Sequence, residues 1–300
     1  MTLYDYDLHN HTELSKDGLT PGRTLIDMAA KRGMKGLGIC DHDEFPDESL
    51  YAYARQKGIK LALGTEFTCE LSHVIGFNMH PQGPDRIFME DRFHHLRQDS
   101  IDTAITLING LHDEGFDITT ENVIRFSGKK NIQKLFVLTY MAEVCKTYPP
   151  HIKKRFTSWA DARVYIADKP YYVPDGASIE ELDPLRAIEL IHSAGGYAVW
   201  AHPFFTPEKL RSQYFKTFCA KGIDAIEASY CYQENGYKGE ETNRQIEEKV
   251  RLFLQEKGIP ASGGSDSHFP VKTYADLSPI RPGDMGIQED EFAGVSAFFR

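Results

Sequence analysis

The sequence has few cysteines and none of the cysteine patterns that mark a disulfide or zinc scaffold. Its five cysteines are an odd number, lie far apart and include no CxxC pair. This excludes a disulfide framework and a cysteine zinc site, and it is typical of a reducing compartment. The amino terminus lacks an apolar signal segment, and no stretch approaches the roughly 20 apolar residues of a membrane span. We therefore expect a cytoplasmic protein with no membrane partner.

Positive charge is also scarce. Lys and Arg number 34 against 44 Asp and Glu, so the formal net charge is -10. This balance argues against an extended surface for nucleic acid. Internal repeats and low-complexity segments are absent, and the sequence does not indicate an oligomeric state. The 300 residues are 41% hydrophobic, which is enough to build one large α/β domain or two smaller ones.

A short strand opens the chain and ends in a His-x-His pair. Aromatic and apolar residues alternate with polar ones from Tyr4 to Leu8, and His9 and His11 follow. Residues two apart in a strand point to the same face, so these two imidazoles suit one metal ion. Standing alone, the pair would be interpreted as hydrogen-bonded core histidines.

The pair does not stand alone, because strands, polar tips and helices alternate along much of the chain. This order is typical of parallel βα units, whose active residues gather at the carboxyl ends of the strands. The apolar pattern predicts strands at 36–40, 60–64, 73–77, 197–200 and 223–228, and helices at 21–33, 46–57, 184–194, 207–221 and 239–257.

The alternation stops in the middle of the chain. From about residue 91 to 172 the sequence is typical of helices, for example at 100–115, where apolar residues recur at helical spacing. We interpret this part as an inserted helical subdomain that covers the barrel mouth as a lid. The predicted domains are therefore 1–90 with 173–300 as the metal-binding barrel, and 91–172 as the insertion.

The predicted strand tips carry nitrogen and carboxylate side chains of the kinds that zinc, manganese and iron accept. So many at successive tips are hard to attribute to chance, and a barrel mouth would bring them together. They are His9, His11, Asp17, Asp41, His42, Glu66, His73, His202, Asp266 and His268.

These motifs resemble those of the polymerase and histidinol phosphatase (PHP) superfamily of metal-dependent phosphoesterases. They run in the family's order from the start of the chain to near its end, and the middle of the chain is similar to the branch that dephosphorylates nucleotides or degrades short RNA. The matching segments are Asp7-Leu8-His9-Asn10-His11, Asp17-Gly18, Cys40-Asp41-His42, Gly64-Thr65-Glu66, Ala201-His202-Pro203 and Gly264-Ser265-Asp266-Ser267-His268.

The resemblance implies an α/β fold, a distorted (βα)7 TIM-like barrel, around two or three divalent ions (Mn²⁺, Zn²⁺ or Fe²⁺). One ion would be held by His9, His11, Glu66 and Asp266. Glu66 would bridge to a second ion that His202 also binds. Asp17, His42 and His268 would hold a third.

Two positions near this set have a less direct assignment. The resemblance makes His73 the expected further ligand of the second ion. Asn78 is the alternative, because its position matches that of ligands in other branches of the superfamily. Asp41 is interpreted as a residue that fixes a ligand imidazole.

A metal-bound hydroxide held by Glu66 and Asp266 is the expected nucleophile, because paired ions neutralise phosphoryl oxygens and lower the pKa of water. Cys40, Ser265 and Ser267 lack the partners of a covalent nucleophile. The sequence assigns no general acid.

The predicted function is hydrolysis of a phosphate ester of a nucleotide or another small metabolite, and Lys134 and Arg163 are the candidate cationic contacts to phosphate. Three alternatives remain at this point. They are a histidinol-phosphate-type phosphatase, a non-catalytic metal-binding regulatory module, and a barrel hydrolase of the amidohydrolase type, which also opens with His-x-His.

Overall fold

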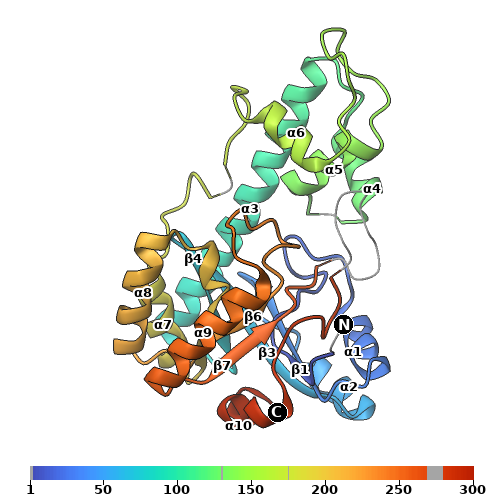
Figure 1. The fold of residues 1–300 in the computed structure, drawn as a ribbon. Coiled ribbons are helices and arrows are strands. Elements are labelled where there is room, and N and C mark those ends of the chain that lie inside the picture. The colour runs from blue at the N-terminus through green and yellow to red at the C-terminus, as the bar shows by residue number, and fades with distance from the viewer. Residues whose placement is uncertain (1–2, 130, 175, 269–279) are drawn as a thin grey trace. The chain divides into compact units, whose positions relative to one another are not determined.

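The computed structural model describes residues 3–129, 131–174, 176–268 and 280–300. In this part of the chain seven strands form one sheet, and each strand pairs with the next one in sequence (Figure 1). The strands are β1 (Tyr6–Asp7), β2 (Gly36–His42), β3 (Lys60–Cys69), β4 (Ser72–Phe77), β5 (Tyr197–Ala201), β6 (Ala225–Tyr230) and β7 (Ala261–Gly264). The α-helices are α1 (Gly22–Lys31), α2 (Leu50–Lys57), α3 (Gly83–Asp113), α4 (Thr120–Ser127), α5 (Lys134–Glu143), α6 (Trp159–Ile166), α7 (Pro184–Ser193), α8 (Glu208–Ala220), α9 (Asn243–Lys257) and α10 (Phe292–Val295).

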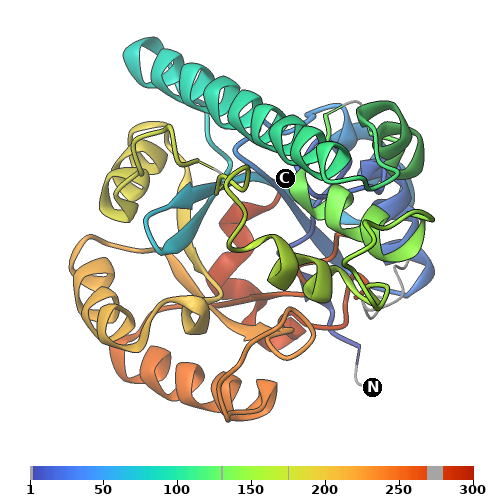
Figure 2. The same cartoon turned by 90° about the horizontal axis from the view of Figure 1, so that it is seen from above.

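The sheet curls until its first and last strands meet, as the view down the barrel shows (Figure 2). The amide of Leu8 donates to the carbonyl of Gly263 at 2.9 Å, and the amide of Asp266 donates to the carbonyl of His9 at 2.8 Å. Gly264 allows this approach, because a Cβ at that position would lie 2.2 Å from the Cβ of His9. The predicted fold, a distorted α/β barrel, is confirmed.

One strand runs against the others. β4 is antiparallel to both β3 and β5, whereas the remaining pairs are parallel. The reason is the short connection between β3 and β4, which leaves no room for the crossover helix that a parallel pair needs. Leu71, at this turn, has a φ of 52°. The reversal brings the start of β4, not its end, to the edge where the parallel strands finish.

Apolar residues fill the barrel and the layer between the sheet and the first two helices. The interior cluster includes Leu8, Ile75 and Val199, and the C-terminal segment contributes Ile287 and Phe298 to it. A second cluster packs α1 and α2 against β2 and β3. Because these contacts occupy the interior, polar side chains are left to gather at the strand ends.

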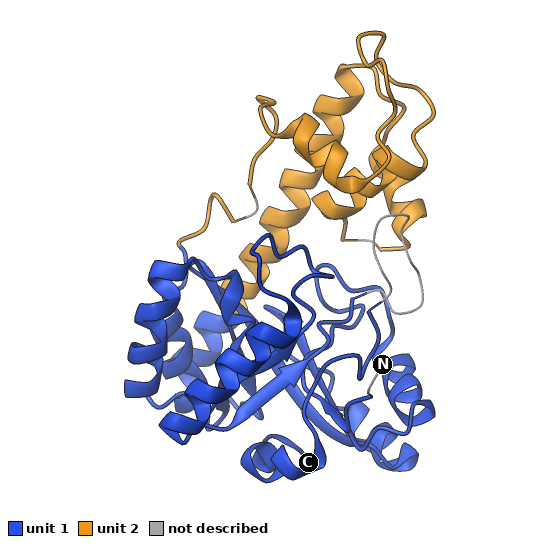
Figure 3. Ribbon diagram, in the orientation of Figure 1, with its two compact units in different colours: residues 1–89, 181–271, 279–300 blue, residues 90–180, 272–278 orange. Residues whose placement is uncertain are grey.

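The chain divides into two compact units (Figure 3). One comprises Met1–Met89, Glu181–Val271 and Pro279–Arg300, and contains the barrel. Among the described residues, the other comprises Glu90–Glu180, and contains most of α3 with α4, α5 and α6. The idea that the helical unit acts as a lid stays a prediction. Among the described helices, none combines the length and apolar character needed to cross a bilayer.

Candidate metal centre

All nine side chains predicted from the sequence as metal ligands belong to the barrel unit. His9, His11 and Asp17 follow β1, His42 ends β2, Glu66 lies within β3 and His73 lies near the start of β4. His202 follows β5, and Asp266 and His268 follow β7. The sheet therefore brings together residues that are up to 259 positions apart, as the predicted barrel mouth requires.

Four of these side chains enclose one small space. The Nε2 atoms of His9 and His11 lie 3.1 Å apart. Glu66 Oε2 is 3.1 Å from the first and 3.2 Å from the second, and Asp266 Oδ1 is 3.5 Å and 3.0 Å from them. Ligands about 2.1 Å from a tetrahedral ion are separated by roughly 3.4 Å. These five distances are therefore compatible with the predicted arrangement of four ligands around one ion.

Glu66 faces two groups of imidazoles at once. Its Oε2 atom points to His9 and His11, whereas its Oε1 atom lies 2.9 Å from His73 Nδ1 and 2.9 Å from His202 Nε2. A carboxylate placed in this way suits a bridge between two ions. Asn78, the rival of His73, lies past the other end of β4, where its side chain donates to the carbonyl of Ala297.

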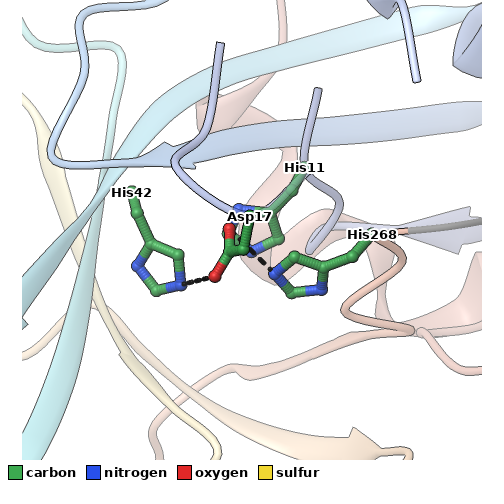
Figure 4. Close-up of side chains that lie close together, drawn as sticks. All are labelled: His11, Asp17, His42 and His268. Atoms are coloured by element: carbon green, nitrogen blue, oxygen red, sulfur yellow. Dashed lines mark ion pairs between the residues drawn. The ribbon is translucent and has the colours of Figure 1, made fainter. Parts of the chain in front are cut away.

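A third group lies beside the first (Figure 4). Asp17 stands between two rings, with Oδ1 3.3 Å from His268 Nε2 and Oδ2 3.7 Å from His42 Nε2. The ring of His11 stacks on that of His268, with centroids 4.2 Å apart. One ligand atom from each of these four residues lies within 4.8 Å of the others, so the group can surround a further ion.

The protonation states of Asp266 and His42 suit the binding of cations by the cluster. Asp266 Oδ1 is buried, and nitrogens of three imidazoles, those of His9, His11 and His268, lie 3.0 to 3.5 Å from it. Burial raises the pKa of Asp266, but the charges of His268 and His9 outweigh this and hold it well below its usual value. Burial lowers the pKa of His42 well below the usual value, which keeps its ring neutral and able to ligate. A buried carboxylate and the imidazole nitrogens that face it together provide the donor atoms that a divalent metal ion binds.

Two of these residues sit in strained backbone. His202 has a φ of 29° and Asp266 a φ of 54°, in the left-handed region that residues with a Cβ rarely adopt. Such strain costs on the order of 1–3 kcal/mol and persists where the surrounding structure imposes it. Both strained residues lie at strand ends that face the cluster. This indicates that the backbone is strained because their side chains are needed there for function.

Glu227, on β6, is a site residue that the sequence analysis missed. It is buried, its Oε1 lies 3.2 Å from His9 Nδ1, and its Oε2 accepts a 2.7 Å hydrogen bond from the amide of His202. A carboxylate behind a histidine holds the ring with Nε2 free to ligate. A signal was present, because Glu227 is the charged residue in the otherwise uncharged strand 225–230.

Two hydroxyl groups also support the cluster and were missed. Tyr230 donates to Asp266 Oδ2 at 2.5 Å and accepts from Asn235 at 3.1 Å. Ser15 is buried, lies 3.2 Å from His11 Nδ1 and donates to Asp17 at 2.7 Å. Serine and tyrosine are too common in loops and strands for their types alone to have indicated these roles.

Three other sequence assignments have clear positions. Asp41 accepts hydrogen bonds from the amide and hydroxyl of Thr12, at 2.6 and 2.8 Å, so it holds the loop after His11 rather than an imidazole ring. Lys134 is buried in the helical unit, donates to the carbonyl of Val173 and lies 5.3 Å from the ring centroid of Tyr172. Arg163 is exposed on α6. Contact of Lys134 or Arg163 with phosphate stays a prediction.

Metal binding is expected to release protons. Burial lowers the pKa of His11, but hydrogen bonds to Asp266 and Glu66 and the charges of both carboxylates outweigh it and raise the pKa from 6.5 to about 10. At neutral pH the metal-free ring is therefore protonated, and an ion that takes the same nitrogen must displace the proton. We expect apparent affinity for Mn²⁺ to weaken as pH falls.

Calorimetry of chelator-stripped protein in two buffers of different ionisation enthalpy measures this release. Equal heats in both buffers would contradict it. Without metal, the same raised pKa stabilises the fold below the ordinary histidine pKa of 6.5, and that contribution is lost as pH rises through about 10.

Comparison with known proteins places this geometry in context. A family model described as the PHP domain matches residues 7–154. The 5'-3' exoribonuclease of Haemophilus influenzae is 27% identical over 282 residues, which cover 88% of this chain and 90% of that protein. The 5'-3' exoribonuclease Rnm of Escherichia coli is 26% identical over 283 residues, which cover 88% and 85%.

Two solved structures share the fold. One is from Bifidobacterium adolescentis, assigned as a metal-dependent phosphoesterase, with a TM-score of 0.73 at 22% identity over 98% of this chain and 96% of that chain. The other is an amidohydrolase from Chromobacterium violaceum with bound sulfate and no metal, with a TM-score of 0.71 at 21% identity over 99% and 97%. At these identities the likeness concerns the fold alone.

The relatives overturn one expectation. The sequence analysis expected a small-molecule phosphate ester as partner and no extended nucleic-acid surface, and this is wrong, because the curated relatives are named as exoribonucleases, which act on RNA. The error came from using the net charge of the whole chain. Net charge describes the average surface, whereas cations bound at a site reverse the local potential.

Proposed function

Because this chain belongs to the PHP family of metal-dependent phosphoesterases, we propose that it removes nucleotides one at a time from the 5′ end of RNA. Membership makes it a hydrolase of phosphoester bonds. The finer assignment, RNA and its 5′ end, draws on the names of the curated relatives, whose alignments span 88% of the chain.

The observation that carries the proposal is the position of Glu66, with one oxygen toward His9 and His11 and the other toward His73 and His202. A bridging carboxylate is what a pair of ions acting on one phosphodiester requires. Ions held there would neutralise the phosphoryl charge and lower the pKa of water. We propose His9, His11, Glu66 and Asp266 for one ion, Glu66, His73 and His202 for a second, and Asp17, His42 and His268 for a third.

The protein's own side chains prepare this site. Glu227 orients His9, and Tyr230 holds Asp266. A cleft of about 530 Å³ opens onto the cluster, and within the described chain the residues that line it include no Lys or Arg. Metal ions held by the cluster would supply countercharge to a phosphodiester in this cleft. We therefore expect the reaction to depend on metal.

Short RNAs labelled at either end test the proposal. Chelator-stripped protein with Mn²⁺, Zn²⁺ or Fe²⁺ added back is expected to release a 5′ label at once as a mononucleotide, while a 3′ label passes through a ladder of shortening products. Removal of metal is expected to stop both. DNA of the same sequence, a nucleoside monophosphate and histidinol phosphate serve as comparison substrates. Metal-loaded protein that leaves RNA intact but dephosphorylates one of the small substrates would overturn the proposal.

A further inference from the structure

The cleft above the metal cluster has two exposed apolar side chains on its wall. Six of its fourteen lining residues are predicted metal ligands, but Leu71 and Phe205 also line it, and they are 55% and 39% exposed. Exposing large apolar side chains to water is unfavourable, and apolar surface beside a catalytic cleft commonly marks a ligand-binding surface. The two residues come from separate loops, at the β3–β4 turn and after β5.

Phe205 lies next to a predicted metal ligand. It ends the 3-10 turn Pro203–Phe205, and its amide donates to the carbonyl of His202 at 3.1 Å. Its ring centroid lies 5.6 Å from that of His202. The preceding residue, Phe204, is buried and has the guanidinium of Arg211 3.9 Å from its ring centroid. Phe204 therefore anchors the turn and leaves Phe205 at the cleft.

Among the residues that the structure describes, no ring stacks in parallel on Phe205. Its aromatic neighbours within the described chain are His202, Tyr230, Tyr232 and Tyr237, and they meet it at interplanar angles between 52° and 88°. None of these contacts is a parallel stack, and the side chain remains 39% exposed where it lines the cleft, so part of the ring is open to a ligand. A flat ligand can use that part of the ring.

From this arrangement we infer that Phe205, with Leu71 on the same cleft wall, forms the subsite for the base of the 5′-terminal nucleotide. The inference rests on the proposed function. A single ribose joins a base to its phosphate, so a phosphate at the metal cluster places its base next to the cluster, where Phe205 lies. Bases stack on aromatic side chains with little regard to sequence, which suits an enzyme that must accept every terminal nucleotide in turn.

A cycle of two changes, one in the protein and one in the RNA, tests this subsite. Wild type and Phe205→Ala are compared on a short RNA with a normal 5′ nucleotide and on the same RNA with an abasic 5′ nucleotide. The loss of one stacked base is expected to lower kcat/KM on the order of 10-fold. The variant is expected to lose this factor on normal RNA and almost nothing on abasic RNA, since the second change removes the same contact.

Three further variants make the result specific. Phe205→Leu keeps an apolar side chain in the turn and is expected to lose nearly as much as alanine, whereas Phe205→Tyr keeps the ring and is expected to retain activity. Phe88→Ala removes a ring of similar exposure, 42%, that does not line the cleft, and is expected to change neither substrate's rate. Metal content, measured in parallel, should be equal in all of them.

The outcomes separate the two proposals. Equal losses of Phe205→Ala on normal and abasic RNA would overturn the base subsite while leaving RNA hydrolysis established. A wild-type protein that binds metal and degrades neither RNA would overturn the proposed function and the subsite with it. A loss confined to the normal RNA, rescued by tyrosine, supports both.

Discussion

An Asp266→Asn variant is expected to lose bound metal and phosphodiester hydrolysis together. Asp266 Oδ1 is buried and lies 3.0 Å from His11 Nε2 and 3.5 Å from His9 Nε2, so it would contribute a negative charge to a cation shared with these imidazoles. Asparagine keeps the shape and tolerates the φ of 54° at this position better than alanine would. Loss of one charged ligand removes several kcal/mol of stabilisation, or roughly 10³-fold in rate.

The measurement pairs metal content by mass spectrometry with RNA turnover. Asp224→Asn is the matched control, because Asp224 also pairs with a histidine, His192, but is half-buried just before β6, at the opposite end of that strand from Tyr230. The control is expected to keep its metal and activity. An Asp266→Asn protein with a full complement of metal and normal turnover would show that Asp266 is not a ligand.

Glu227→Gln is expected to weaken metal binding without removing a proposed ligand. Glu227 contacts His9 Nδ1 and the amide of His202. It therefore sets the orientation and basicity of the His9 ring, and it also holds the strained backbone at His202. Loss of such a supporting carboxylate commonly costs 10–100-fold in metal affinity or activity. Because the ligands remain, we expect high Mn²⁺ concentration to restore most of the turnover.

This recovery distinguishes support of the metal from a general packing role. Titration of Mn²⁺ into stripped wild type and variant gives both the affinity and the maximal rate. Glu189→Gln serves as the control, since Glu189 pairs with Lys221 on the exposed surface and is expected to leave both quantities unchanged. A Glu227→Gln variant whose rate stays low at saturating Mn²⁺ would place Glu227 in a role other than metal support.

The types and order of the candidate ligands could be predicted from the sequence because they depend on local patterns. Histidines two apart after a strand, or an aspartate after a run of small residues, are visible in any window of ten residues. We could expect these side chains to lie close together, because parallel strands have their carboxyl ends at the same edge of the sheet. Glu66 and Asp266 were predicted in this way, and the barrel that joins them is confirmed.

The choice between His73 and Asn78 needed the tertiary structure. Both residues flank the same short strand, and the sequence pattern is compatible with either direction of that strand. The tight β3–β4 turn makes β4 antiparallel, so His73 at its start reaches Glu66 and Asn78 lies past the far end. The short connection fixes this direction only once the two strands are known to pair with each other, and the apolar patterns that predict the strands do not show their pairing.

The sequence by itself determined the α/β barrel class, the candidate ligands and the family, because these rest on periodicity and on chemistry carried by short motifs. The division of these ligands among ions and the bridging place of Glu66 were expected from the family resemblance. Only the tertiary structure decided the distances between them, and that Glu227, Tyr230 and Ser15 support them. It also decided that Phe205 lies on the wall of the cleft. The physical reason is that side-chain distances are set by the closure of the sheet, where residues more than 200 positions apart come within 3 to 4 Å.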